Sequence, residues 1–161
     1  MKRFILLIFT AAVLSGCYRA PEPKAPEVTA GKDEFLIAVR MDTDDNVYRL
    51  GHEYALDGVP VGGGELMNGR LEPIEGEVYM SFQRDILLEK GEDTHGFSVV
   101  FFVADTPAAP EDMGQASHTG EYAVENEICF SPRYGEIYNV TVSGSKKDGY
   151  RAELTSLSED N

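Results

Sequence analysis

The sequence predicts an all-β protein, built as one antiparallel sandwich of about seven to nine strands. Short runs in which apolar and polar residues alternate recur along the chain from residue 34 onward, which is typical of half-buried strands. Glycine, proline, asparagine and aspartate separate these runs, as expected of turns between strands. No stretch after the N-terminal segment repeats apolar residues with a helical period, so helices are not expected to contribute to the core.

The first two strands are expected over residues 34–40 and 47–56, where apolar side chains alternate onto one face. Asp57 and Gly58 then provide a tight turn, because the turns that suit hairpins need positive φ and glycine supplies it. The returning strand contains Pro60, which lacks an amide donor, so this strand is predicted to be short or at a sheet edge.

A run of three glycines, residues 62–64, predicts a flexible turn or a bulge after this hairpin. Residues 76–84 form the next alternating run, and 97–104 are apolar on both faces, which predicts a central strand that is covered on both sides. Residues 105–120 are the longest irregular stretch. Further strands are predicted over 121–130, 136–144 and 149–157.

The closing pattern, Tyr-x-Val-x-Val, a loop, then Gly-Tyr-x-Ala-x-Leu, resembles the last hairpin of many immunoglobulin-like domains. The resemblance implies an immunoglobulin-like sandwich, with a small antiparallel β-barrel as the structural alternative. Neither architecture specifies a function.

The N-terminus has the layout of a secretory signal. Lys2 and Arg3 precede an apolar run over residues 4–14, which is shorter than the roughly 20 residues of a membrane-spanning helix. The run closes with Leu-Ser-Gly-Cys, in which the cysteine is Cys17. This segment resembles the lipobox of bacterial lipoproteins, and an ordinary signal peptide with a coincidental cysteine is the alternative.

The resemblance implies that Cys17 receives a diacylglycerol and becomes the first residue of the mature chain. Two or three acyl chains would hold a domain at a bilayer, so a lipid-anchored protein of the cell envelope is expected. Tyr18 stands where an aspartate favours inner-membrane retention in enterobacterial lipoproteins, which implies the outer membrane in a cell with two membranes and the outer face of the cell membrane otherwise.

These segments divide the chain into four parts. We expect a signal peptide over residues 1–16, the lipidated cysteine and a proline-rich tether over 17–32, a single β-sandwich domain over 33–158 and a tail over 159–161.

The net charge excludes one class of partner. The chain carries −14, and removal of Lys2 and Arg3 with the signal peptide would leave −14 − 2 = −16. Such a chain is repelled by nucleic-acid phosphates, so no nucleic-acid binding is expected and membrane attachment must come from lipid. With Cys17 acylated, Cys129 is the other cysteine, so no intramolecular disulfide is available. Cys129 is predicted to be a buried thiol, with an exposed reactive thiol or an intermolecular disulfide as the alternatives.

One acidic turn offers a weak metal site. Asp42, Asp44, Asn46 and Glu53 occupy positions 1, 3, 5 and 12 of a loop that superficially resembles an EF-hand. Position 6 is Val47 where an EF-hand has glycine, and both flanks are predicted to be strands. The favoured interpretation is therefore an acidic hairpin loop, with calcium as the alternative and no other cofactor expected.

The histidines do not suggest catalysis. His95 lies near the carboxylates Glu89, Glu92 and Asp93, and His118 lies near Ser117, but neither set amounts to a triad or a metal site on its sequence spacing. His52 alternates onto an apolar face and is predicted to be a partly buried, hydrogen-bonded side chain. An enzyme is not expected.

The function predicted from these observations is a non-enzymatic binding or structural module, monomeric, whose partner is an unidentified envelope protein or glycan. Its working surface is expected in the loops 105–120 and 42–46, because loops on a rigid sandwich carry recognition. The alternatives are a small envelope enzyme or enzyme inhibitor that uses the 105–120 loop, or a barrel that carries a ligand.

Overall fold

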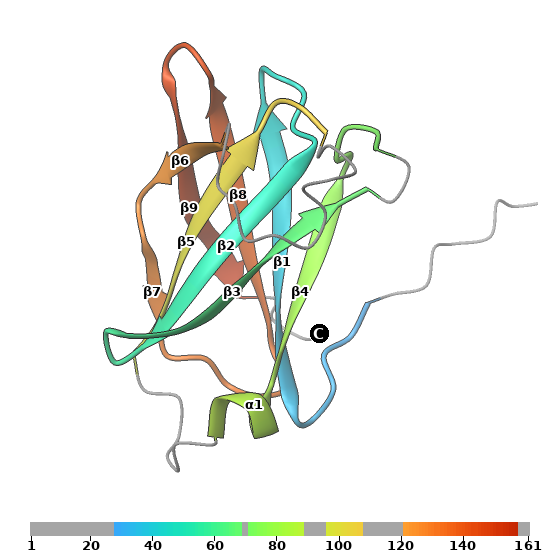
Figure 1. The fold of residues 1–161 in the computed structure, drawn as a ribbon. Helices are drawn as coiled ribbons and strands as arrows, with labels where there is room; N and C mark the ends of the chain where they lie inside the picture. The colour runs from blue at the N-terminus through green and yellow to red at the C-terminus, as the bar shows by residue number, and fades with distance from the viewer. Residues whose placement is uncertain (1–27, 69–70, 89–95, 108–120, 158–161) are drawn as a thin grey trace, which may run out of the picture.

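The computed structural model describes residues 28–68, 71–88, 96–107 and 121–157 of the chain. Within them the protein is all-β, with nine strands and a single five-residue helix (Figure 1). The elements are β1 Glu34–Thr43, β2 Arg49–Leu56, β3 Val59–Met67, β4 Glu77–Gln83, α1 Arg84–Leu88, β5 Phe97–Ala104, β6 Glu121–Glu125, β7 Ile128–Phe130, β8 Ile137–Ser145 and β9 Gly149–Leu157.

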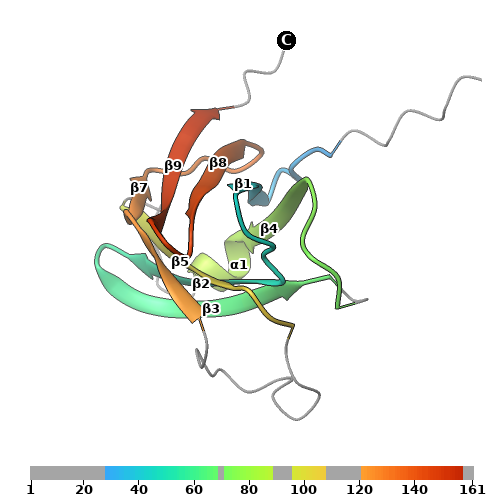
Figure 2. The ribbon, with the colours of Figure 1, turned by 90° about the horizontal axis from the view of Figure 1, so that it is seen from above.

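All nine strands belong to one curled sheet. Its order is β3-β2-β5-β6-β9-β8-β1-β4, and β7 pairs with β5 beside this path. Viewed from above, the strands surround a common interior and form a nearly closed barrel, with β3 and β4 as the two ends of the sheet (Figure 2). The barrel predicted as the alternative is compatible with this arrangement, whereas the antiparallel immunoglobulin-like sandwich is not confirmed.

The sheet is also mixed in direction. β1 runs parallel to β8, with Leu36 opposite Ile137, and β6 runs parallel to β9. The remaining pairs are antiparallel. Alternation in the sequence shows which residues share a face but does not show which strands are neighbours, so an entirely antiparallel arrangement was the wrong expectation.

The interior of the barrel is filled by side chains. The Phe35 ring stacks on Phe82 with centroids 5.1 Å apart and meets Phe97 edge-on at 5.2 Å, geometries that aromatic pairs favour. The apolar side chains around these rings are fully or nearly buried: Ile37, Val39, Leu50, Met80, Val99, Phe101, Val103, Tyr138, Val140, Val142, Tyr150 and Ala152. The helix α1 lies at the end of the barrel where β4 finishes (Figure 1), and its Leu87 is buried.

Most predicted strands are present, and the Asp57-Gly58 turn is confirmed by positive φ at both residues, 49° and 77°. The glycine run 62–64 was predicted as a turn or bulge. The glycines lie inside β3, so the turn is wrong, but a register shift adjoins them. Tyr54 pairs with Gly62 and Ala55 with Pro60, which leaves Val61 as the extra residue of β3. β3 is nevertheless an edge strand, as Pro60 predicted.

The run 121–130 was predicted as one strand but forms two, β6 and β7. Asn126 between them has a φ of 73°, a left-handed conformation that breaks a strand and that asparagine tolerates better than most residues. β5 agrees better with its prediction. Its inward side chains are buried, and the outward Ser98 and Ala104 are buried as well.

Candidate functional site: the loop end of the barrel

The topology sorts the connections between strands into two ends. β1 and β8 are parallel, whereas β8–β9, β2–β5 and β5–β6 are antiparallel pairs. As a result, the strand residues that flank four of the connections lie at the same end of the barrel. We call this the loop end; it carries the connections 44–48, 68–76, 105–120 and 146–148. The opposite end, where the chain enters β1 at Glu34, we call the entry end.

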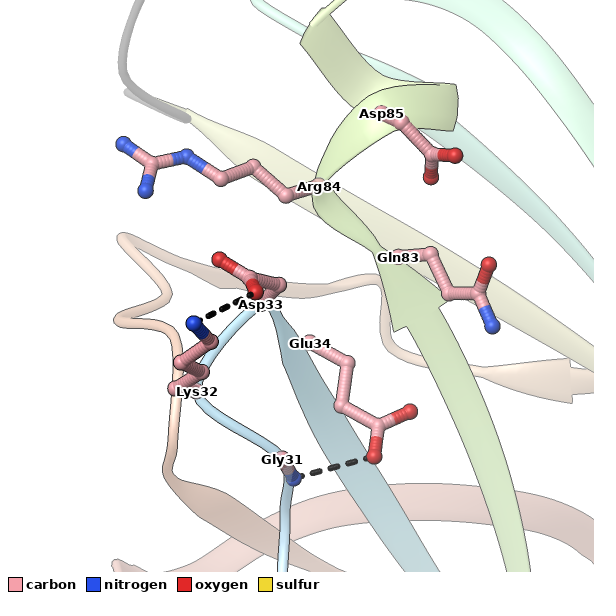
Figure 3. Close-up of a pocket in the computed structure, with 7 residues that line it drawn as sticks. All are labelled: Gly31, Lys32, Asp33, Glu34, Gln83, Arg84 and Asp85. Atoms are coloured by element: carbon pink, nitrogen blue, oxygen red, sulfur yellow. Dashed lines mark hydrogen bonds and ion pairs between the residues drawn. The ribbon is translucent and has the colours of Figure 1, made fainter.

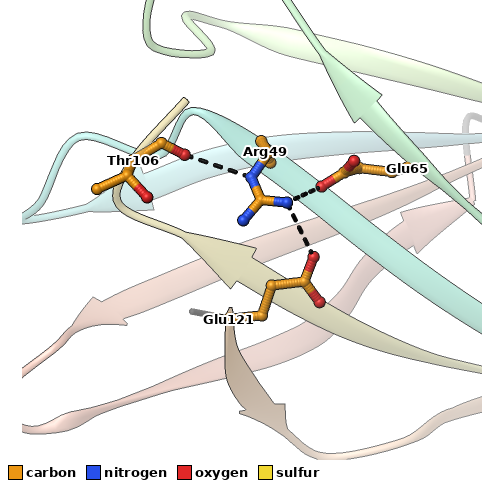
Figure 4. A network of polar contacts seen from close by, with 4 residues as sticks. All are labelled: Arg49, Glu65, Thr106 and Glu121. Carbon is orange, nitrogen blue, oxygen red and sulfur yellow. Dashed lines mark hydrogen bonds and ion pairs between the residues drawn. The ribbon is translucent and has the colours of Figure 1, made fainter. Parts of the chain in front are cut away.

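An arginine on the outer surface of the barrel organises one side of the loop end (Figure 4). Arg49 begins β2 and alternates with the inward-facing Leu50. Its Nη1 lies 2.8 Å from Glu65 Oε1 of β3 and 3.6 Å from Glu121 Oε1 of β6. Its Nε donates to the carbonyl of Thr106, 3.3 Å away. One guanidinium therefore joins both stems of the 105–120 connection to β2 and β3.

These charges are buried although they lie outside the barrel. The side chain of Arg49 is 8% exposed and that of Glu121 is 4% exposed, whereas Glu65 is 28% exposed. Charges at such depth are strongly destabilising unless they are paired. We conclude that the network fixes the stems in one arrangement.

A lysine organises the neighbouring side of the loop end. Lys146, in the β8–β9 turn, donates its backbone N–H to Asp45 Oδ2 at 2.6 Å. Its Nζ lies 2.7 Å from Asp105 Oδ2 and 5.1 Å from the centre of the Tyr122 ring. One lysine thus contacts both the acidic 42–46 turn and the first residue of the 105–120 connection. Both segments were predicted as parts of the working surface.

The protonation states of this cluster follow from these contacts. The Lys146 N–H and then the Tyr150 hydroxyl, 2.9 Å away, hold the pKa of Asp45 below its usual value. Burial, followed by the Asp45 carboxylate, raises the pKa of Tyr150 to about 12. The hydrogen bond to Asp105 raises the pKa of Lys146. All three groups keep their ordinary charges at neutral pH, so they hold structure and are not poised to transfer a proton.

The proposed calcium ligands are not brought together as a site. Asp42 and Asp44 are exposed around the end of β1, and Asn46 is exposed in the following turn. Glu53 lies within β2 and pairs with Val100 of β5 and Gly63 of β3. Among the described residues, no group of three or more histidine, cysteine, aspartate or glutamate side chains has the arrangement of a metal site.

Two other sequence predictions need correction. His52 is half-buried inside the barrel as predicted, but its Nδ1 is buried and has no hydrogen-bond partner in the structure. Cys129 was predicted to be buried and is exposed. It points opposite to the buried Ile128, as alternation requires, and within the described residues no second layer of strands covers that face of β7.

Several predicted residues lie outside the described part of the chain. They are Cys17, the acidic group Glu89, Glu92 and Asp93 with His95, and the Ser117 and His118 pair, as well as residues 108–120 of the long connection. Their placement is therefore left to experiment.

The entry end carries an open concavity of about 670 Å³ (Figure 3). It is formed where the chain enters β1 and where β4 passes into α1, and its lining is polar: Gly31, Lys32, Asp33, Glu34, Gln83, Arg84 and Asp85. The Ser81 hydroxyl and then the Gly31 N–H hold the pKa of Glu34 below its usual value. Since Lys32 and Asp33 are largely exposed, this is a solvated surface depression without an enclosed reaction site.

Comparisons with known proteins leave the chain without a family. No family model and no curated protein sequence matches it. It is similar to the structure described as the membrane-binding domain of pneumolysin, with a TM-score of 0.36 and 12% identity over 80% of this chain and 99% of that one. A second structure, described as "Trapped Toxin", has a TM-score of 0.32 and 10% identity over 80% of this chain and 24% of its own. Both TM-scores are too low to establish a shared fold or function.

Sequence reasoning missed the two basic residues at the centre of these networks. Arg49 and Lys146 stand out only as positive charges in a chain with twice as many acidic as basic residues. Lys146 and Asp45 are 101 positions apart, so only the strand order brings them together.

As for membrane-spanning helices, none of sufficient length and apolar character occurs in the described residues.

Proposed function

We propose that this protein is a lipid-anchored component of a bacterial envelope, with a non-enzymatic β-barrel domain that binds a partner through its loop end. The sequence Leu-Ser-Gly-Cys at residues 14–17 supports the anchor. The observation that carries the rest is the position of Glu34, where the chain enters β1 at the end of the barrel opposite to the loop end. An anchor that precedes residue 34 would therefore attach on the side away from the loops.

The rigidity of the loop end supports a role in binding. Arg49 ties the stems of the 105–120 connection to β2 and β3 through buried charged groups, and the exposed Lys146 contacts both Asp45 and Asp105. Surfaces with fixed stems lose less conformational entropy when they bind, which favours affinity. The partner is an envelope protein or glycan of unknown identity, and in a cell with two membranes we place the protein at the outer membrane.

The filled interior favours this proposal over a ligand-carrying barrel. Phe35, Phe97 and Phe82 meet inside the barrel near its entry end, with centroid distances of 5.0 to 5.2 Å, and Val103, Val140 and Val142 are buried farther along the interior. A barrel that carries a small molecule instead keeps a cavity lined by such residues.

The anchor is tested by the variant Cys17→Ser. When cells are fractionated after labelling with radioactive palmitate, the unmodified protein should carry label and sediment with membranes, whereas Cys17→Ser should lose the label and leave the membrane fraction. Cys129→Ser is the matched control and should behave like the unmodified protein. A Cys17→Ser variant that is labelled and membrane-bound would refute the proposal.

A further inference from the structure

The barrel has one break in its ring of hydrogen-bonded strands. β3 and β4 are the two ends of the sheet order, and no ladder joins them in the described part of the chain. Figures 1 and 2 show these strands following one another around the ring. We call the facing edges of Val59–Met67 and Glu77–Gln83 the seam. Unpaired strand edges are templates for the addition of another strand.

Aromatic rings close the seam from the inside. Gly62 and Gly64 of β3 pair with Tyr54 and His52 of β2, and a Cβ at either glycine would lie 3.0 to 3.1 Å from the nearest atom of those rings. The absence of side chains on β3 thus lets both rings lie across it, a known way to stabilise glycine in sheets.

These rings reach the opposite edge. The Tyr54 and Phe82 centroids are 5.2 Å apart, and the His52 and Phe82 centroids are 6.0 Å apart. Tyr54 remains half-exposed, as does Val78 of β4. The seam therefore has an apolar floor that is only partly covered.

The outer edge of β3 is protected at its start but not in its middle. Proline and β-bulges are devices that prevent edge pairing, and Pro60 and the register shift opposite Ala55 provide both at the beginning of β3. The following residues, Gly62 to Gly64, are exposed and have no side chains to shield their backbone.

Charge selects among the possible occupants. The charged side chains of β3 and β4 are both carboxylates: Glu65, which is paired with Arg49, and Glu77, which accepts a hydrogen bond from Tyr79 and lies opposite Arg40 in the β1–β4 register. The connection between the strands adds Glu72 and Glu75, with Arg70 as its basic residue. The whole chain carries −14, so a second copy would be repelled. A segment that carries lysine or arginine would be attracted.

We propose that the seam binds an extended, basic segment of a partner protein as an added β-strand. Its apolar side chains would alternate inward onto Tyr54 and Phe82, and its lysine or arginine side chains would point outward near Glu77. Main-chain hydrogen bonds would supply affinity, and the alternating side chains would supply specificity. This binding does not depend on the lipid anchor.

The test uses three fluorescein-labelled peptides and the purified full chain. Ac-KVKVKVK-NH₂ is the probe, Ac-EVEVEVE-NH₂ reverses its charge, and Ac-KVKPKVK-NH₂ keeps its charge but introduces a proline that cannot donate to a ladder. We expect the probe to bind at least tenfold more tightly than either control by fluorescence anisotropy. Hydrogen exchange should show new protection confined to β3 and β4.

A pair of variants locates the charge effect. Glu77→Gln at the seam should weaken binding of the probe about threefold, whereas Glu153→Gln, an exposed residue of β9, should leave it unchanged. Equal binding of the proline peptide, protection outside the seam, or no binding of any peptide would overturn the proposal. A dimer in sedimentation whose contacts protect the seam would overturn it in favour of a second copy.

Discussion

His52 is an ionisable side chain in an apolar setting. The groups around it inside the barrel are the rings of Tyr54 and Phe82 and the backbone of Gly64. Burial lowers its pKa below the ordinary value of 6.5. The neutral imidazole is therefore the form that the folded barrel accommodates.

This shift predicts a specific loss of stability in mild acid. As the pH falls below about 6.5, the unfolded chain gains a proton on His52 that the folded chain binds less readily, so the free energy of unfolding decreases. Above that pH the contribution is fully present. Urea unfolding at pH 7.0 and 5.5 should show this decrease for the unmodified protein.

His52→Leu is the variant that isolates the effect and should show a smaller decrease between the same two pH values. The pKa values of Glu34 and Asp45 are lowered from 4.5 and 3.8, so their contributions are lost only at more acidic pH. The same decrease in both proteins would show that His52 is not responsible.

Arg49 should matter more than any exposed basic residue. Its removal in Arg49→Met leaves the carboxylate of Glu121, which is 4% exposed, without this cation. Breaking a buried pair in this way costs about 3 kcal/mol. Urea unfolding should show this loss for Arg49→Met, and Arg40→Met, at an exposed arginine of β1, should change stability by less than about 0.5 kcal/mol.

The double variant Arg49→Met with Glu121→Gln distinguishes a charge effect from lost packing. Neutralising the buried carboxylate should recover more than half of the loss. If the double variant is as unstable as the sum of the single variants, the two side chains are not coupled.

Among the elements, β3 depends on its glycines for its path. A Cβ at Gly63 would lie 2.4 Å from the carbonyl oxygen of His52, which is backbone and cannot move aside easily. Gly63→Ala should therefore lower the unfolding free energy by about 2 kcal/mol. At Gly51 of β2 the nearest atom to an added Cβ is 3.4 Å away, so Gly51→Ala should differ from the unmodified protein by less than about 1 kcal/mol. Equal losses in the two variants would refute this explanation.

Alternation and turn chemistry predicted individual elements better than their arrangement. The β2–β3 turn followed from Asp57-Gly58, and the β8–β9 hairpin followed from the loop before Gly149. The turn predicted at the glycine run was wrong, because the rings of Tyr54 and His52 on another strand occupy the space that side chains at Gly62 and Gly64 would fill. A local signal cannot report such a cross-strand partner.

At the scale of the molecule, what could not be predicted is the strand order. The parallel pairing of β1 with β8 sets the loop end opposite to the entry end and brings Lys146 to Asp45. The Arg49 network depends instead on the antiparallel strand order β3-β2-β5-β6. Of the acidic 42–46 turn, residues 44–46 lie outside strands, whereas Asp42 and Thr43 belong to β1. Of the long connection, the described residues 105–107 lie outside strands. The proximity of these two segments depends on pairings between strands that are distant in the chain.

The entry end lies opposite to the loop end, but the length of the tether also determines how the proposed anchor orients the barrel. The 16 residues from Cys17 to Lys32 are joined by 15 Cα–Cα steps and have a contour length of about 50 Å, whereas the ten residues of β1 span about 33 Å. A tether longer than the barrel does not by itself keep the loop end away from the bilayer. Deletion of residues 18–27 would leave a reach of about 17 Å, shorter than the barrel.

We therefore predict that orientation becomes fixed only when the tether is shortened. In a Cys129→Ser background, a fluorophore is attached at Asp85→Cys of the entry end or at Lys147→Cys of the loop end, and energy transfer to acceptor-labelled lipids is measured. The deletion should give clearly stronger transfer from Asp85→Cys than from Lys147→Cys, because the entry end adjoins the anchor. The full tether should give a smaller difference between the two sites. Equal transfer from both sites in the deletion variant, or stronger transfer from the loop end, would show that the loop end does not face away from the membrane.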